Sequence, residues 1–125
     1  MTGTKLFAMA LDLLNLRNSD GSTPENIADM KLRAVNIINI CLAECAPLNR
    51  LLCKDDAGKE IQSLDETVCC APYIFSAVLP FGVAAYLSLD EDPALSRYLE
   101  EKYRLAYRTA QRSSKARLHA ITEVV

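Results

Sequence analysis

The sequence has 125 residues, of which 50% are hydrophobic and 24% are charged. A chain of this length forms one domain, because two cores would leave each half too small to bury most of its surface, and this composition excludes an intrinsically disordered protein. The net charge of -2 conceals an asymmetry: residues 1–96 carry 7 Lys and Arg against 13 Asp and Glu, whereas residues 97–125 carry 7 against 3. We therefore expect an acidic body and a basic C-terminal end.

The first predicted helix spans about residues 4–16, where apolar residues recur at every third or fourth position. Leu6, Ala10 and Leu13 share one stripe of this helix, and we expect the stripe to face the core. The following residues, 17–21, are rich in Asn, Ser, Asp and Gly, which favour turns.

A second, long helix is predicted over residues 22–46. Ser22 or Thr23 can cap its N-terminus. Residues 35–42 are apolar on nearly every side, which is typical of a helix at the centre of a domain. Pro47 is expected to end this helix, because proline cannot continue the hydrogen-bond ladder.

Residues 48–66 show no helical pattern. Short apolar pieces at 51–53 and at Ile61 flank residues 55–58, which have the composition of a turn. The sequence therefore predicts a small hairpin or an ordered loop near residues 50–64.

Residues 67–89 form a run of 23 residues without a charge, which is long enough to cross a bilayer. However, Pro72 and Pro80 interrupt the run, acidic residues flank both of its ends, and no Lys or Arg lies beside it to orient insertion. We therefore expect no membrane segment and a helix buried within the domain. The run forms either one kinked helix or two short ones, and we favour a break at Pro80.

The last predicted helix begins after the capping pair Asp92 and Pro93 and continues to about Gln111. Its apolar stripe is formed by Leu95, Leu99, Tyr103, Ala106 and Ala110. Beyond this stripe the apolar pattern fades, so we predict a helical domain of residues 1–112 and an extended C-terminal tail of residues 113–125. The predicted fold class is mainly all-α, a compact bundle of about four to five helices.

The cysteines predict packing in a reduced protein rather than covalent or metal chemistry. Their number is odd and two are adjacent, unlike a disulfide framework, so the reducing cytosol is the expected folding compartment. No Cys-x-x-Cys pair indicates a zinc site, and buried free cysteine commonly acts as a small hydrophobe. The five cysteines are Cys41, Cys45, Cys53, Cys69 and Cys70.

The sequence predicts neither a catalytic site nor a cofactor. The single histidine, His119, lies far along the chain from every cysteine, and nothing orients it as the base of a nucleophile pair. The four glycines are isolated, so no phosphate-binding loop is indicated. Acidic residues occur as neighbours in sequence, which do not face each other on a helix. We therefore expect a non-enzymatic protein without a metal.

Basic residues recur at helical spacing near the C-terminus. Arg104, Arg108, Arg112 and Lys115 are separated by 4, 4 and 3 positions and so share one helical face. Three interpretations stay open: a solvated face that offsets the negative end of the helix dipole, a face that meets the acidic body of a second copy, and a contact with nucleic-acid phosphates. The residues expected at an oligomer or partner interface are Arg104, Arg108, Arg112, Lys115, Arg117, Ile121, Val124 and Val125.

The motif LPFGVAAYL at residues 79–87, followed by DEDPAL at 90–95 and by Tyr98 and Tyr103, resembles the small head-to-tail connector (adaptor) proteins of tailed bacteriophages. The order of the predicted elements is similar too: a short amphipathic helix, a long second helix, an acidic-capped turn and a basic last helix with a tail. The five cysteines and residues 48–66 depart from this resemblance.

The resemblance implies a non-enzymatic virion protein that forms a ring of about twelve copies through head-to-tail contacts. The ring would lie between the portal protein and the tail or stopper protein, and DNA would pass through its channel without sequence-specific binding. The implied location is the host cytoplasm during assembly and the virion afterwards, with no membrane partner. The alternatives are another phage tail-completion or packaging accessory protein, and a small helical DNA-binding regulator that places Arg104, Arg108 and Arg112 on phosphates.

Overall fold

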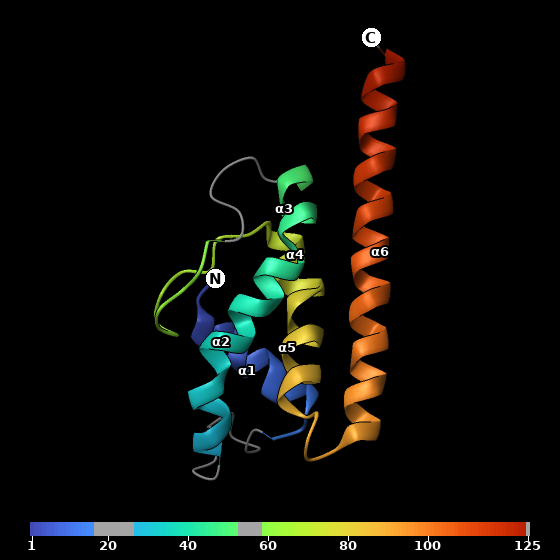
Figure 1. Ribbon diagram of the computed structural model, residues 1–125. Helices are drawn as coiled ribbons and strands as arrows, with labels where there is room; N and C mark the ends of the chain where they lie inside the picture. The colour runs from blue at the N-terminus through green and yellow to red at the C-terminus, as the bar shows by residue number, and fades with distance from the viewer. Residues whose placement is uncertain (17–26, 53–58, 125) are drawn as a thin grey trace.

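The computed structural model describes residues 1–16, 27–52 and 59–124, with side chains up to Ser113. In this part of the chain, helices pack around one apolar core (Figure 1), which confirms the predicted mainly all-α fold class. The helices are α1 (Gly3–Leu13), α2 (Ala28–Glu44), α3 (Ala46–Leu52), α4 (Pro72–Ala77), α5 (Leu79–Leu87) and α6 (Pro93–Val124). Among the described residues, β-type pairing is limited to an isolated antiparallel bridge between Thr2 and Thr67.

Helix α1 is the first predicted helix, and it ends earlier than residue 16 because the chain turns at Asn15. Asn15 has a left-handed backbone with φ of 57°. The backbone N–H of Leu16 donates to the carbonyl oxygen of Leu11 at 2.9 Å. This is the arrangement of a Schellman motif, in which Asn tolerates the left-handed position and the last helical carbonyls are satisfied. The buried face of α1 includes Leu6, Phe7, Ala10 and Leu11.

Helix α2 lies within the long helix predicted over residues 22–46, and α3 follows it in residues that were mostly predicted to form a loop. The predicted start at 22–26 lies outside the described residues. At the other end α2 stops at Glu44 and Cys45 caps it, two residues before the predicted end, but Pro47 is not what ends it, because α3 follows at once and contains Pro47. Pro47 lies in the first turn of α3, where a backbone N–H has no helical partner to lose.

The predicted hairpin or ordered loop is, where the structure describes it, an ordered loop. Residues 53–58 lie outside the described chain, residues 51–52 belong to α3 and are not extended, and residues 59–71 form the loop. The side-chain amide of Asn39 on α2 accepts from the backbone N–H of Ile61 and donates to its carbonyl oxygen, both at 2.9 Å. These two bonds place Ile61 in the core, where it is 2% exposed.

Helices α4 and α5 confirm the break predicted within residues 67–89. Val78 separates them, and Pro80 lies in the first turn of α5. Helix α5 is buried on nearly every side and packs against α1, α2 and α6. In the part of the chain that the structure describes, no helix is both long and apolar enough to span a membrane.

Helix α6 begins as predicted, with the carboxylate of Asp92 accepting from the backbone N–H of Leu95 at 3.1 Å. Its predicted stripe faces the bundle, because Leu99, Tyr103 and Ala110 are buried. The helix is longer than predicted: its backbone is helical to Val124. The residues predicted as a tail form the last part of α6, up to Val124. This part projects from the bundle, beyond the level of α3 in Figure 1.

Candidate functional site

The basic face expected at the C-terminal end is present on α6 where side chains are described. Arg104, Arg108 and Arg112 are exposed, and their spacing places them along one face of the helix. Arg104 Nη2 donates to Glu100 Oε1 at 2.6 Å, between side chains that are 66% and 50% exposed, so this ion pair is screened by water and stabilises the fold little.

The remaining predicted interface residues are not described at the level of side chains. Lys115, Arg117, Ile121 and Val124 lie on the helical backbone of α6, and their side chains fall outside the described part. Val125 lies outside the described residues altogether. Their role at an interface therefore stays a prediction.

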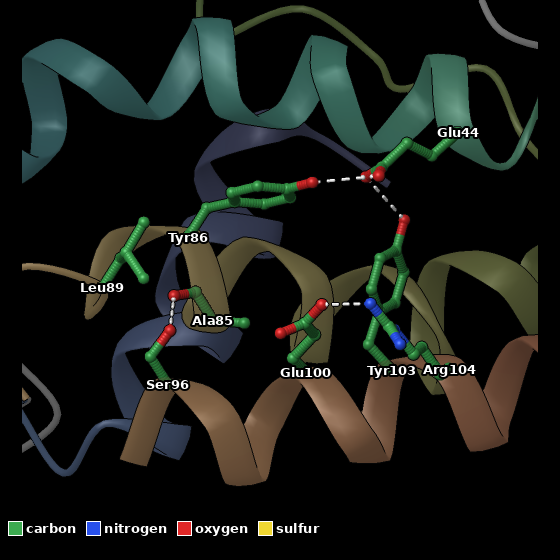
Figure 2. Close-up of a pocket in the computed structure, with 8 residues that line it drawn as sticks. All are labelled: Glu44, Ala85, Tyr86, Leu89, Ser96, Glu100, Tyr103 and Arg104. Carbon is green, nitrogen blue, oxygen red and sulfur yellow. Dashed lines mark hydrogen bonds and ion pairs between the residues drawn. The ribbon is translucent and has the colours of Figure 1, made fainter. Parts of the chain in front are cut away.

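Arg104 borders a polar cluster that the sequence analysis did not identify. The cluster joins the end of α2 to α5 and α6 through Glu44 (Figure 2). The Tyr86 hydroxyl donates to Glu44 Oε2 at 2.9 Å, and the Tyr103 hydroxyl donates to Glu44 Oε1 at 3.2 Å. One carboxylate thus ties together three helices.

Tyr103 reaches this position because α5 has no side chain at Gly82. A Cβ atom built on Gly82 would lie 2.8 Å from Cε1 and Cζ of the Tyr103 ring, well inside the ordinary contact distance of about 3.5–4.0 Å. The ring passes this point and continues to Cys45, whose sulfur is 3.5 Å from the Tyr103 hydroxyl oxygen. The glycine of the LPFGVAAYL motif therefore sets the distance between α5 and α6.

The thiols beside this cluster are buried and hold their protons. Burial raises the pKa of Cys45 to about 11, and the nearby charge of Glu44 adds to that rise. Burial also raises the pKa of Cys41, with further contributions from Glu44 and Cys45. Because the thiolate is the reactive form of cysteine, neither residue is activated as a nucleophile. Cys41, Cys45 and Cys70 are buried, which confirms their predicted packing role, while Cys69 is half-buried and Cys53 lies outside the described residues.

The tyrosines of the cluster also stay protonated at neutral pH. Burial, the hydrogen bond to Glu44 and the charge of that carboxylate raise the pKa of Tyr86 to about 12. Burial raises the pKa of Tyr103 further, and neighbouring Cys41, Cys45 and Glu44 act in the same direction. The phenols therefore act as hydrogen-bond donors to Glu44, and they do not supply a base.

Two hollows adjoin the cluster and together form a groove along α6. The first has a volume of about 310 Å³. The second, of about 230 Å³, continues along the helix and shares Glu44, Tyr103 and Arg104 with the first. The first hollow is lined by Glu44, Ala85, Tyr86, Leu89, Ser96, Glu100, Tyr103 and Arg104, and the second adds Tyr107 and Arg108.

No set of three or more His, Cys, Asp or Glu side chains in the described part of the chain is placed to hold a metal ion. What the groove offers instead is two carboxylates, phenol rings and arginines close together. One feature of the sequence could have identified Glu44 as a candidate: it is the single charged residue between Arg33 and Arg50. Its convergence with Tyr86 and Tyr103 depends on how three helices pack, and sequence spacing does not contain that information.

No protein-family model, no curated protein and no solved structure matches this chain. A function must therefore be argued from the surfaces of the molecule and from the resemblance carried by residues 79–103.

Proposed function

We propose that this protein is a non-enzymatic assembly protein, a head-to-tail connector of a tailed bacteriophage or prophage, that forms a ring between the portal protein and the tail or stopper protein. DNA passes through the ring without sequence-specific contacts, and the protein moves from the host cytoplasm into the virion. The observation that carries the proposal is the form of α6: a helix of 32 residues that projects past the bundle with a row of exposed arginines.

The charges just before α6 and in its middle part support contacts between copies. Asp90, Glu91 and Asp92 are exposed just before the helix begins, whereas Arg108 and Arg112 are exposed farther along it. Asp92 and Arg108 are 16 residues apart, which is about 24 Å along a helix and two to three times the screening length at physiological salt. These charges therefore do not neutralise each other within one copy. A head-to-tail contact, in which unlike patches of neighbouring copies meet, brings them together and closes into a ring at a suitable rotation.

The same arginines favour a second candidate, a small helical DNA-binding regulator. Phosphate binding by a row of arginines would give an affinity that falls steeply with salt. The acidic body argues for a protein partner instead, because residues 1–96 carry an excess of negative charge that repels DNA. Another phage assembly factor, such as a tail-completion or packaging accessory protein, would use the same surfaces and differ in its partner.

The proposal is tested by measuring the mass of the assembly at high protein concentration, with and without a portal protein as template. Sedimentation velocity of the unaltered chain should show a closed multimer near twelve copies, the number that the resemblance implies. The double variant Arg108→Glu/Arg112→Glu should remain monomeric, because both charges then repel the acidic patch of the next copy.

A matched control is Lys102→Glu, which changes charge by the same amount per site. Lys102 is exposed and lies about 120° around the helix from Arg108 and about 80° from Arg112, at 100° per residue, so this variant should still assemble. A monodisperse monomer under both conditions contradicts the proposal. Binding of duplex DNA with a steep salt dependence, together with a monomeric mass, would favour the regulator.

A further inference from the structure

The first hollow beside α6 is shaped as a small, partly enclosed binding pocket. Its volume of about 310 Å³ lies at the lower end of the range of about 300–1,000 Å³ for small-molecule sites. Figure 2 shows the space between Glu44 and Tyr86 on one side and Glu100 on the other, with Tyr103 closing one end. The hydroxyl proton of Ser96 is not available to a ligand, because Ser96 Oγ donates it to the carbonyl oxygen of Ala85 at 2.6 Å.

The charges that line the pocket favour a cation. Two carboxylates, Glu44 and Glu100, reach it from different helices, and Arg104 is the one basic residue in its lining. Arg104 pairs with Glu100, whereas the described partners of Glu44 are the neutral hydroxyls of Tyr86 and Tyr103. The pocket lining therefore has a net charge of about -1, which repels an anionic ligand.

The tyrosines add a surface that suits an organic cation rather than a metal ion. Both hydroxyl protons are donated to Glu44, so the rings rather than the hydroxyls are left to contact a ligand. Ammonium groups are attracted to the negative face of an aromatic ring within about 6 Å of its centre. The aliphatic side of the pocket is supplied by Ala85 and Leu89, against which a short carbon chain can pack.

We propose that the pocket between α5 and α6 binds an organic ammonium group with a short aliphatic chain, held by Glu44 and Glu100 and contacted by the rings of Tyr86 and Tyr103. The group is either that of a free amine or that of a lysine side chain on a partner. This site goes beyond assembly through the arginine row, with which it shares Arg104.

The test uses n-butylammonium as the probe and neutral n-butanol, of the same length, as the comparison. The ring resonances of tyrosine are observed by NMR in the full chain. Butylammonium should shift the resonances of Tyr86 and Tyr103 along a saturable curve, and butanol at the same concentration should not. Equal shifts with the two probes, or no saturable shift with butylammonium, overturn the proposal.

Two variants separate a charge effect from a general change in the fold. Glu44→Gln removes the charge and keeps one oxygen that accepts from one tyrosine, while its NH2 group can donate to the hydroxyl oxygen of the other, so butylammonium should bind at least tenfold more weakly. Glu101→Gln is the matched control, because Glu101 is exposed on α6 beside Glu100 and does not line the pocket; the affinity of this variant for butylammonium should stay within twofold. Unchanged affinity in Glu44→Gln contradicts the site.

A last comparison distinguishes the two sources of the ammonium group. Nα-acetyl-lysine amide should bind more tightly than butylammonium when the pocket receives a partner's lysine, and more weakly when it receives a free amine. The mass of the assembly should be the same in Glu44→Gln as in the unaltered chain. The binding site is therefore tested by the NMR titration and ring formation by sedimentation velocity, so either proposal can fail without the other.

Discussion

Replacing Gly82 by alanine tests how closely α5 and α6 pack. The new methyl group would lie 2.8 Å from two ring carbons of Tyr103. The ring is 8% exposed, and its hydroxyl is bonded to Glu44, so it has little room to move away. Overpacking of this kind costs about 1–3 kcal/mol, whereas alanine in place of glycine within a helix stabilises it by about 1 kcal/mol. Because the ring is held at both ends, we expect a net loss of about 1–2 kcal/mol.

The free energy is measured by urea unfolding followed by circular dichroism, and in thermal unfolding the Tm should fall by about 4–8 °C. The same substitution in a Tyr103→Leu background is the control, because the shorter side chain removes the clash and leaves the gain in helix propensity. There, Gly82→Ala should be neutral or stabilising, and the two sites should show a coupling energy of at least about 1 kcal/mol. A stabilised Gly82→Ala variant of the unaltered chain would refute the argument from close packing.

Three further predictions concern the bundle. Asn49→Ala should destabilise the protein by about 2–3 kcal/mol in urea unfolding, since Asn49 is fully buried and its Oδ1 accepts from the backbone N–H of Ala71 at 3.0 Å; a loss below 0.5 kcal/mol contradicts this. Asp92→Ala should cost about 1 kcal/mol through loss of the α6 cap, and Asp92→Asn should restore most of it. Burial raises the pKa of Cys45 from 9.0 to about 11, so the unfolded chain releases this proton at lower pH than the folded chain does. The free energy of unfolding should therefore be independent of this thiol below about pH 8 and decrease as pH rises from about 9 to 11; a Cys45→Ala variant should show a shallower decrease, and an identical pH profile would exclude the thiol as its cause.

The helices could be predicted where local pattern and local chemistry agree. The stripe at Leu99, Tyr103 and Ala110 and the cap at Asp92 identify α6, because amphipathic spacing and capping act within a few residues. The break at Pro80 follows from the covalent geometry of proline. Pro47 was misjudged for a related reason: proline ends one helix or begins the next, and which of these occurs depends on whether the chain after it can pack as a helix.

The length of α6 shows where pattern alone is insufficient. The apolar stripe fades after Ala110, and the sequence analysis therefore separated residues 113–125 from the domain. The backbone nevertheless continues as a helix to Val124. The basic face was predictable from spacing, whereas its function as an interface stays a prediction, because a contact between copies depends on a second surface.

The sequence by itself determined the class of the fold, the acidic body and basic end, and the positions of most helices, because these follow from composition, periodicity and capping over short distances along the chain. The tertiary structure alone decided that Glu44, Tyr86 and Tyr103 meet, although they lie on three helices and are up to 59 residues apart. It also decided that Gly82 permits the close approach of α5 and α6. Contacts of this kind arise from the mutual packing of helices at native density, and no local pattern in the sequence specifies which side chains that packing brings together.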